Sequence, residues 1–138
     1  MKALFVLILF VFSFAITIPV ANAQNTPAQQ PAAKILKPKV YAADLIFAFQ
    51  LLNTIELRGS EVDALLEVKN ALKPYIEKIQ KENLQLNAVV TFDISAPLAY
   101  NLLQFMERGK FTGSDAEKYK RFVEAMSEAA KAIESSTK

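Results

Sequence analysis

Apolar residues recur every three or four positions along most of the chain after residue 40, as they do in helices that bury one face. The first such segment, residues 40–58, is apolar around most of a helical circumference, and Gly59 follows it as a typical helix-ending residue. A helix this apolar needs cover from other helices or from another subunit. It therefore predicts a candidate apolar interface, which consists of Ile46, Phe47, Phe49 and Leu51.

The second helical pattern covers residues 60–83. Ser60 is suited to cap its first turn, and the apolar residues that follow keep to one face. Pro74 lies inside this pattern and lacks the amide hydrogen that a helix interior requires. The sequence therefore predicts either a bend near residues 70–74 or two shorter helices.

Residues 84–94 alternate between apolar and polar side chains, which is typical of a strand. A single strand cannot satisfy its backbone groups, however, and no second segment after residue 23 shows comparable alternation. We therefore favour a helix for this segment and keep a strand as the alternative. In the helical interpretation, Pro97 marks a kink or the first turn of a new helix, which ends at Arg108 before Gly109.

The last helical pattern has the most clearly marked start. Ser114 and Glu117 stand in the spacing of a capping box, in which each side chain accepts a hydrogen bond from the other residue's amide. The helix then keeps one apolar stripe as far as Ile133, and we expect residues 135–138 to fray. Four helices with short connections predict an all-α domain over residues 40–138, a small antiparallel four-helix bundle.

Residues 1–23 have the pattern of a secretory signal peptide. Lys2 is followed by a long apolar run and by an Ala-Asn-Ala cleavage motif at residues 21–23, so we expect Gln24 to begin the processed chain. The run is shorter than the roughly 20 apolar residues that cross a bilayer, which leaves an uncleaved membrane anchor as the less favoured alternative. We therefore expect a periplasmic or secreted protein with no stable membrane span after cleavage.

Between the signal peptide and the bundle, residues 24–39 form a predicted flexible linker rich in proline, alanine, glutamine and lysine. Such a composition offers too little apolar surface to offset the entropy lost on ordering. Its lysines predict at most a weak contact with an anionic surface, and a solvated tail is the favoured alternative. These lysines are Lys34, Lys37 and Lys39.

Composition removes several kinds of chemistry. The chain has no histidine to act as a general base or metal ligand, and no cysteine to act as a nucleophile. The acidic residues nearest one another carry no metal-binding motif, and we interpret them as solvated helix charges. They are Asp44, Glu56, Glu61, Asp63 and Glu67. We expect no enzyme, no metal site and no cofactor.

Net charge argues against nucleic acid as a partner. The chain has 16 basic and 14 acidic residues, a formal net charge of +2. Nucleic-acid-binding domains typically concentrate a strong basic excess on one face. We therefore expect no nucleic-acid binding.

The loop that precedes the last helix carries the candidate partner contact. Its sequence, Arg-Gly-Lys-Phe-Thr-Gly at residues 108–113, exposes an aromatic side chain beside cations, and such residues commonly anchor interfaces. The alternative is that the phenylalanine folds back over the end of the bundle. The candidate contact consists of Arg108, Lys110, Phe111, Tyr119 and Arg121.

These patterns favour an exported, non-catalytic helical protein in the cell envelope. It would act as a protein-interaction or chaperone-like module that binds another protein or associates with itself. The alternative function is a carrier of a small apolar ligand in the bundle core. Its cavity would be lined by Phe47, Phe49, Phe92, Phe105 and Phe122.

Overall fold

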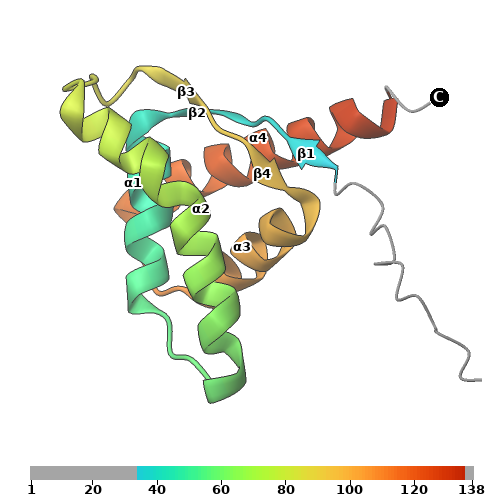
Figure 1. Cartoon of the computed structure of the whole chain (residues 1–138). Helices are drawn as coiled ribbons and strands as arrows, with labels where there is room; N and C mark the ends of the chain where they lie inside the picture. Colours follow the sequence, from blue (N-terminus) through green and yellow to red (C-terminus); the bar gives the residue numbers. More distant parts are fainter. Residues whose placement is uncertain (1–33, 136–138) are drawn as a thin grey trace, which may run out of the picture.

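The structure is a computed structural model, and it describes residues 34–135. The predicted signal peptide, its cleavage site and residues 24–33 of the predicted linker lie outside the described residues. The described part is mostly helical and also contains short strands (Figure 1). Its four α-helices are α1 (Ala42–Leu51), α2 (Val62–Lys81), α3 (Ala96–Arg108) and α4 (Ala116–Ser135).

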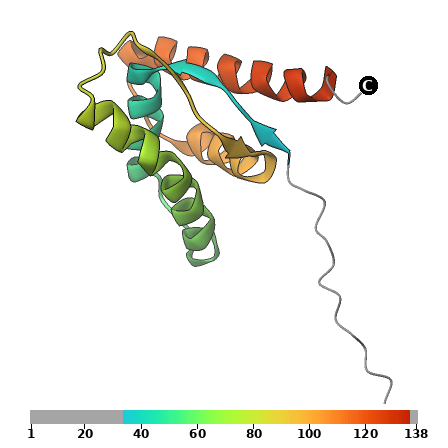
Figure 2. The same cartoon turned by 45° about the horizontal axis from the view of Figure 1, so that its top comes forward.

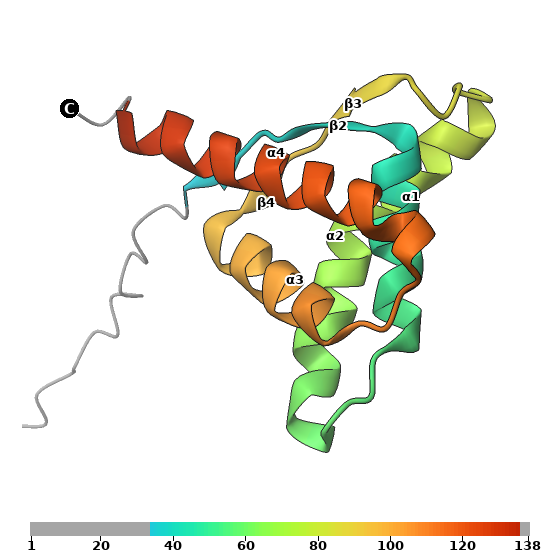
Figure 3. The ribbon, with the colours of Figure 1, turned by 180° about the vertical axis from the view of Figure 1, so that it is seen from behind.

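The helices form two packed pairs. α1 packs mainly against α4, and α2 packs mainly against α3. Figures 1 and 3 show α4 lying across α1 rather than alongside it. The four expected helices are confirmed. The expectation of an all-α domain did not include the short strands that the structure also contains.

The strands form two antiparallel pairs. β1 (Ile35–Leu36) pairs with β4 (Ile94–Ser95), and β2 (Lys39–Tyr41) pairs with β3 (Val89–Thr91). β1 and β2 lie beside α4 and follow part of its course in Figure 2. The strands therefore join the beginning of the described chain to a segment that lies about 50 to 60 residues further on.

The helix that we favoured for residues 84–94 is wrong, and the strand alternative holds for β3 and β4. The side chains of Val90, Phe92 and Ile94 are buried while those between them are exposed, as the alternation predicts for a strand. The partner strand lies in the segment that we interpreted as a linker. There Leu36 and Val40 are buried in the same alternating way.

The flexible linker also differs from the structure over residues 34–39, which belong to the paired region. Pro38 stands between β1 and β2, where its missing amide hydrogen breaks no ladder bond, and its carbonyl accepts a hydrogen bond from the Phe92 amide at 3.3 Å. Lys37 and Lys39 point to solvent. The polar composition of this segment therefore did not indicate its strands, in which every second side chain is buried.

Helix boundaries differ from the sequence expectations in two places. α1 ends at Leu51 and a short 3-10 turn continues it to Thr54, so residues 55–58 are not helical. The Thr54 hydroxyl donates a hydrogen bond to the Leu51 carbonyl at 2.8 Å and so competes with further helix. α2 is one helix that runs through Pro74, not two shorter helices.

The start of α4 also uses other contacts than the predicted capping box. The Thr112 hydroxyl lies 2.6 Å from the Ser114 hydroxyl and 3.3 Å from a carboxylate oxygen of Asp115. The Glu117 carboxylate instead lies 3.7 Å from the Arg121 guanidinium. The helix therefore begins close to the predicted position, at Ala116, with a different polar arrangement.

The core lies where the helices and the inner face of the strands meet. Every helix and the β2–β3 pair contribute side chains that are almost fully buried. The largest of these are Phe92, Phe122, Leu45, Leu52, Leu72, Ile94, Leu102, Met106 and Met126.

Between residues 34 and 135, no helix is both long and apolar enough to span a membrane.

Candidate functional site

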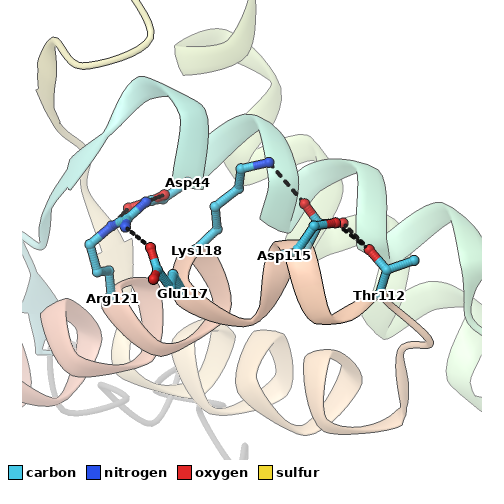
Figure 4. A network of polar contacts seen from close by, with 7 residues as sticks. Asp44, Thr112, Asp115, Glu117, Lys118 and Arg121 are labelled. Atoms are coloured by element: carbon cyan, nitrogen blue, oxygen red, sulfur yellow. Dashed lines mark hydrogen bonds and ion pairs between the residues drawn. The ribbon is translucent and has the colours of Figure 1, made fainter.

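The candidate partner-contact residues divide into three groups in the structure. The first contains Arg121 on α4, which pairs with Asp44 on α1 (Figure 4). The Arg121 Nε donates to Asp44 Oδ2 at 3.0 Å, and Nη2 donates to Oδ1 at 2.7 Å. This is a two-point contact between a planar guanidinium and a carboxylate. It holds the two helices together at their crossing.

Asp44 is the charged residue that contradicts our interpretation of solvated acids. Its side chain is 1% exposed, whereas that of Arg121 is 42% exposed. The hydrogen bond with Asp44 raises the pKa of Arg121, and the nearby Glu117 adds to this. The Tyr41 ring lies 5.7 Å from the same guanidinium. Arg121 is therefore satisfied inside the chain and is not a free cation for a partner.

The second group is aromatic. Phe111 stacks on Tyr119 with ring centroids 4.8 Å apart, and its ring meets that of Phe47 edge-on at 5.8 Å. Phe111 remains 40% exposed. Of the two interpretations of this residue, the structure shows a ring that folds back onto the end of α1 while keeping an exposed side.

The third group holds the loop between α1 and α2. Arg108 donates to the Glu61 carboxylate through Nη1 at 2.6 Å and Nη2 at 3.1 Å, and to the Glu56 carbonyl at 2.6 Å. Lys110 lies 3.7 Å from the Glu56 carboxylate, and both side chains are largely exposed. The hydrogen bond from Arg108 lowers the pKa of Glu61, and the Arg58 amide lowers it further. The contacts of Arg108 fix this loop, whereas Lys110 stays largely exposed.

The candidate apolar interface on α1 is largely occupied by the protein's own core. Phe47 is 7% exposed and Leu51 is 3% exposed. Ile46 and Phe49 are partly buried against the core, and the Lys69 ammonium lies 5.6 Å from the Phe49 ring. Of the four residues, Ile46 and Phe49 retain part of their surface.

A different apolar surface is exposed, and sequence reasoning missed it. Tyr41 and Val89 face each other across the β2–β3 pair and are 43% and 62% exposed. Leu86, whose carbonyl accepts a hydrogen bond from the Ala43 amide, is 64% exposed. We call Tyr41, Leu86 and Val89 the apolar face. The sequence signal for this face was the pair Val89-Val90. Adjacent residues of a strand point to opposite faces, so one of the two valines must lie on the outer face.

A hollow of about 330 Å³ lies at the apolar face. Its walls include the side chains of Tyr41 and Leu86, and the Asp44–Arg121 pair fixes one side of it through Arg121. A space of this size admits one large apolar side chain of a partner, with polar groups at its rim. The lining residues are Tyr41, Ala43, Leu86, Asn87 and Arg121.

The phenylalanines proposed for a ligand cavity pack against other side chains. Phe92 and Phe122 are fully buried and stack with ring centroids 6.2 Å apart. The Tyr75 ring is tilted against Phe92, with ring centroids 5.8 Å apart. Phe105 is 5% exposed within the same core. This arrangement is typical of core packing.

No group of three or more acidic residues that could hold a metal ion occurs among residues 34–135. Comparison with known proteins adds no relative to this picture. No protein-family model matches the chain, and neither curated proteins nor solved structures give a significant match to it.

Proposed function

We propose that this chain is an exported, non-catalytic protein-interaction module, and that its apolar face binds apolar segments of other proteins. The observation that carries the proposal is the apolar face itself. Its three apolar side chains are 43%, 62% and 64% exposed, and two of them, Tyr41 and Leu86, line a hollow of about 330 Å³. Exposed apolar side chains that gather at one place commonly mark interaction sites.

The surroundings of the apolar face support binding of an extended segment. Lys39 stands two residues before Tyr41 on the same face of β2, and Asn87 stands at the rim of the hollow beside Arg121, whose guanidinium is held by Asp44. Polar groups at the rim can pair with the backbone of a bound segment while its side chains meet the apolar residues. A chaperone-like role in the cell envelope, with unfolded proteins as clients, fits this chemistry.

Export and a periplasmic or secreted location rest on the pattern of residues 1–23. The intact mass of the chain recovered from outside the cytoplasm tests them, with Gln24 expected as its first residue. The absence of histidine and cysteine supports a non-catalytic role. The carrier alternative has less support, because Phe92 and Phe122 stack on each other.

Binding to an apolar peptide tests the proposal directly. We expect Leu86→Ser to weaken the binding of a fluorescent, uncharged apolar peptide by about tenfold, because it removes the most exposed aliphatic side chain of the face. The measurement is fluorescence anisotropy, with circular dichroism to confirm the fold. Leu66→Ser is the matched control, since Leu66 is 50% exposed on α2, outside the apolar face. Equal binding by both variants would refute a role for the apolar face.

A further inference from the structure

The backbone of β3 has an inner and an outer edge, and the hydrogen bonds to β2 identify them. The Ala42 amide donates to the Ala88 carbonyl at 2.8 Å, and the Phe92 amide donates to the Pro38 carbonyl at 3.3 Å. Hydrogen-bonded residues alternate with non-bonded ones in an antiparallel pair. The backbone groups of Val90, together with the Ala88 carbonyl and the Phe92 amide, therefore point toward β2.

Val89 and Thr91 consequently turn their amide and carbonyl groups away from β2. In the described part of the chain, β2 is the one strand that pairs with β3. Both side chains are exposed. The next residue whose amide points away from β2 is Asp93. This amide is already engaged, because it donates a hydrogen bond to the Tyr75 hydroxyl at 3.0 Å. On the outer edge of β3, Val89 and Thr91 thus have backbone groups available for pairing, and the edge ends at Asp93, whose amide is already bonded.

This edge has few of the features that usually protect an exposed strand. Proteins commonly place lysine, proline or another charge on such an edge to prevent pairing with a second chain. Residues 83–92 contain no charged residue, no proline and no glycine. The shortness of β3, three residues, is the one protection that it shows and limits any contact to a few hydrogen bonds.

We propose that a second copy of this chain pairs with the outer edge of β3, antiparallel and about a two-fold axis at Val90. In this register Val89 of each copy faces Thr91 of the other, so that the open backbone groups of both copies pair with one another. A second copy fits because the two open positions are complementary to themselves. The uncharged segment also brings no like charges together across the axis.

The dimer would extend the surface on which the proposed function rests, although the pairing itself does not depend on that function. Strand order becomes β2, β3, β3, β2, and successive exposed side chains keep to one face of the sheet. Tyr41 and Val89 of both copies then lie on the same face. A dimer would present two apolar faces to one extended client and bind it through both.

Concentration-dependent measurements on the full processed chain test the pairing. We expect sedimentation velocity to show a monomer at micromolar concentration and a dimer toward the millimolar range. Hydrogen exchange of the Val89 and Thr91 amides should slow over the same range, because only dimerisation engages them. A chain that stays monomeric with unchanged exchange at both amides would overturn the proposal.

Two substitutions test whether the two copies pair through the outer edge of β3. Thr91→Pro removes an outward amide, and Thr91→Glu puts a charge on the edge while facing Lys39 within the chain, which favours the fold. Each should weaken dimerisation by about tenfold or more, because the change occurs twice across the axis. A dimer that survives both variants would refute pairing through β3.

The apolar face and the edge can fail separately. Leu86→Ser should weaken peptide binding and leave dimerisation intact, while Thr91→Pro should weaken dimerisation and leave the intrinsic affinity of each face intact. If an added apolar peptide protects the Val89 and Thr91 amides while the chain stays monomeric, the edge belongs to a partner strand and self-pairing is excluded.

Discussion

Two arginine–carboxylate pairs join distant parts of this chain, and their surroundings differ. Arg121 and Asp44 connect α4 to α1, whereas Arg108 and Glu61 connect the end of α3 to the turn before α2. Both arginines make two hydrogen bonds to one carboxylate, and their side chains are 42% and 41% exposed. The carboxylates differ far more, because Asp44 is 1% exposed and Glu61 is 28% exposed.

The difference shows that burial of the acid, not the geometry of the pair, decides what the pair contributes. A buried carboxylate that loses its cation cannot be rescued by water, whereas an exposed one can. Exposed pairs contribute little, since solvent and salt screen them. We therefore expect the Asp44–Arg121 pair to be required for the α1–α4 crossing, and the Glu61–Arg108 pair to be a minor addition to its loop.

Removing Arg121 should give the largest effect. Arg121→Leu leaves the buried Asp44 carboxylate without its cation, so it should lower the free energy of unfolding more than any other change made to the two pairs. The shift of the urea midpoint measures this. Lys120→Leu is the matched control, because Lys120 is 75% exposed on the same helix and lies 3.8 Å from Glu124. Equal midpoints for the two variants would remove the distinction between the pairs.

Packing next to the Arg108–Glu61 pair should contribute more to the free energy of unfolding than the pair itself. Gly109 follows Arg108, and a Cβ atom added there would lie 2.5 Å from two carbon atoms of the Leu51 side chain. Leu51 is 3% exposed and has little room to move. Gly109→Ala should therefore lower the free energy of unfolding by about 1–3 kcal/mol, the usual cost of overpacking.

Gly113→Ala is the control for that substitution. Nothing lies within 4 Å of a Cβ atom added at Gly113, so its effect should stay within about 0.5 kcal/mol. The same urea titration compares the two glycine variants. If they are equally stable, the loop after α3 is not held by its contact with Leu51, and the ion pair of Arg108 would have to hold it.

The sequence predicted the elements that depend on local pattern and missed those that depend on distant partners. α2 and α4 bury one regular stripe each, and their positions were predicted to within a few residues. The strands depend on pairing between residues 35–41 and 89–95, which no local window contains. Lysines and a proline in the first segment then gave it the composition of a linker.

The candidate site divides in the same way. The sequence singled out Phe111 and Tyr119, which do meet, and Arg121, whose partner it did not identify. Asp44 carried a usable signal, because an acid within an otherwise apolar helix needs a cation once that helix is buried. Val89 gave a weak signal as the second of two adjacent valines, whereas the exposure of Leu86 could not be predicted before the turn that carries it was placed beside the strand pair.

Acid pH should give the smallest and most specific effect, and it separates the exposed pair from the buried one. The hydrogen bond from Arg108 lowers the pKa of Glu61 below its ordinary value of 4.5. A carboxylate with a lowered pKa adds stability above that ordinary value and loses it as the pH falls through the lowered one. The urea midpoints of the natural chain and Glu61→Gln should therefore differ slightly at neutral pH and converge as the solution becomes acidic.

About 1 M NaCl should reduce the neutral-pH difference as well, because the pair is exposed. Glu67→Gln, an exposed change on α2, is the control and should show no such convergence. A difference that grew toward acid pH, or one as large as that of Arg121→Leu, would mean that Glu61 behaves as a buried acid, and the contrast between the two pairs would fail.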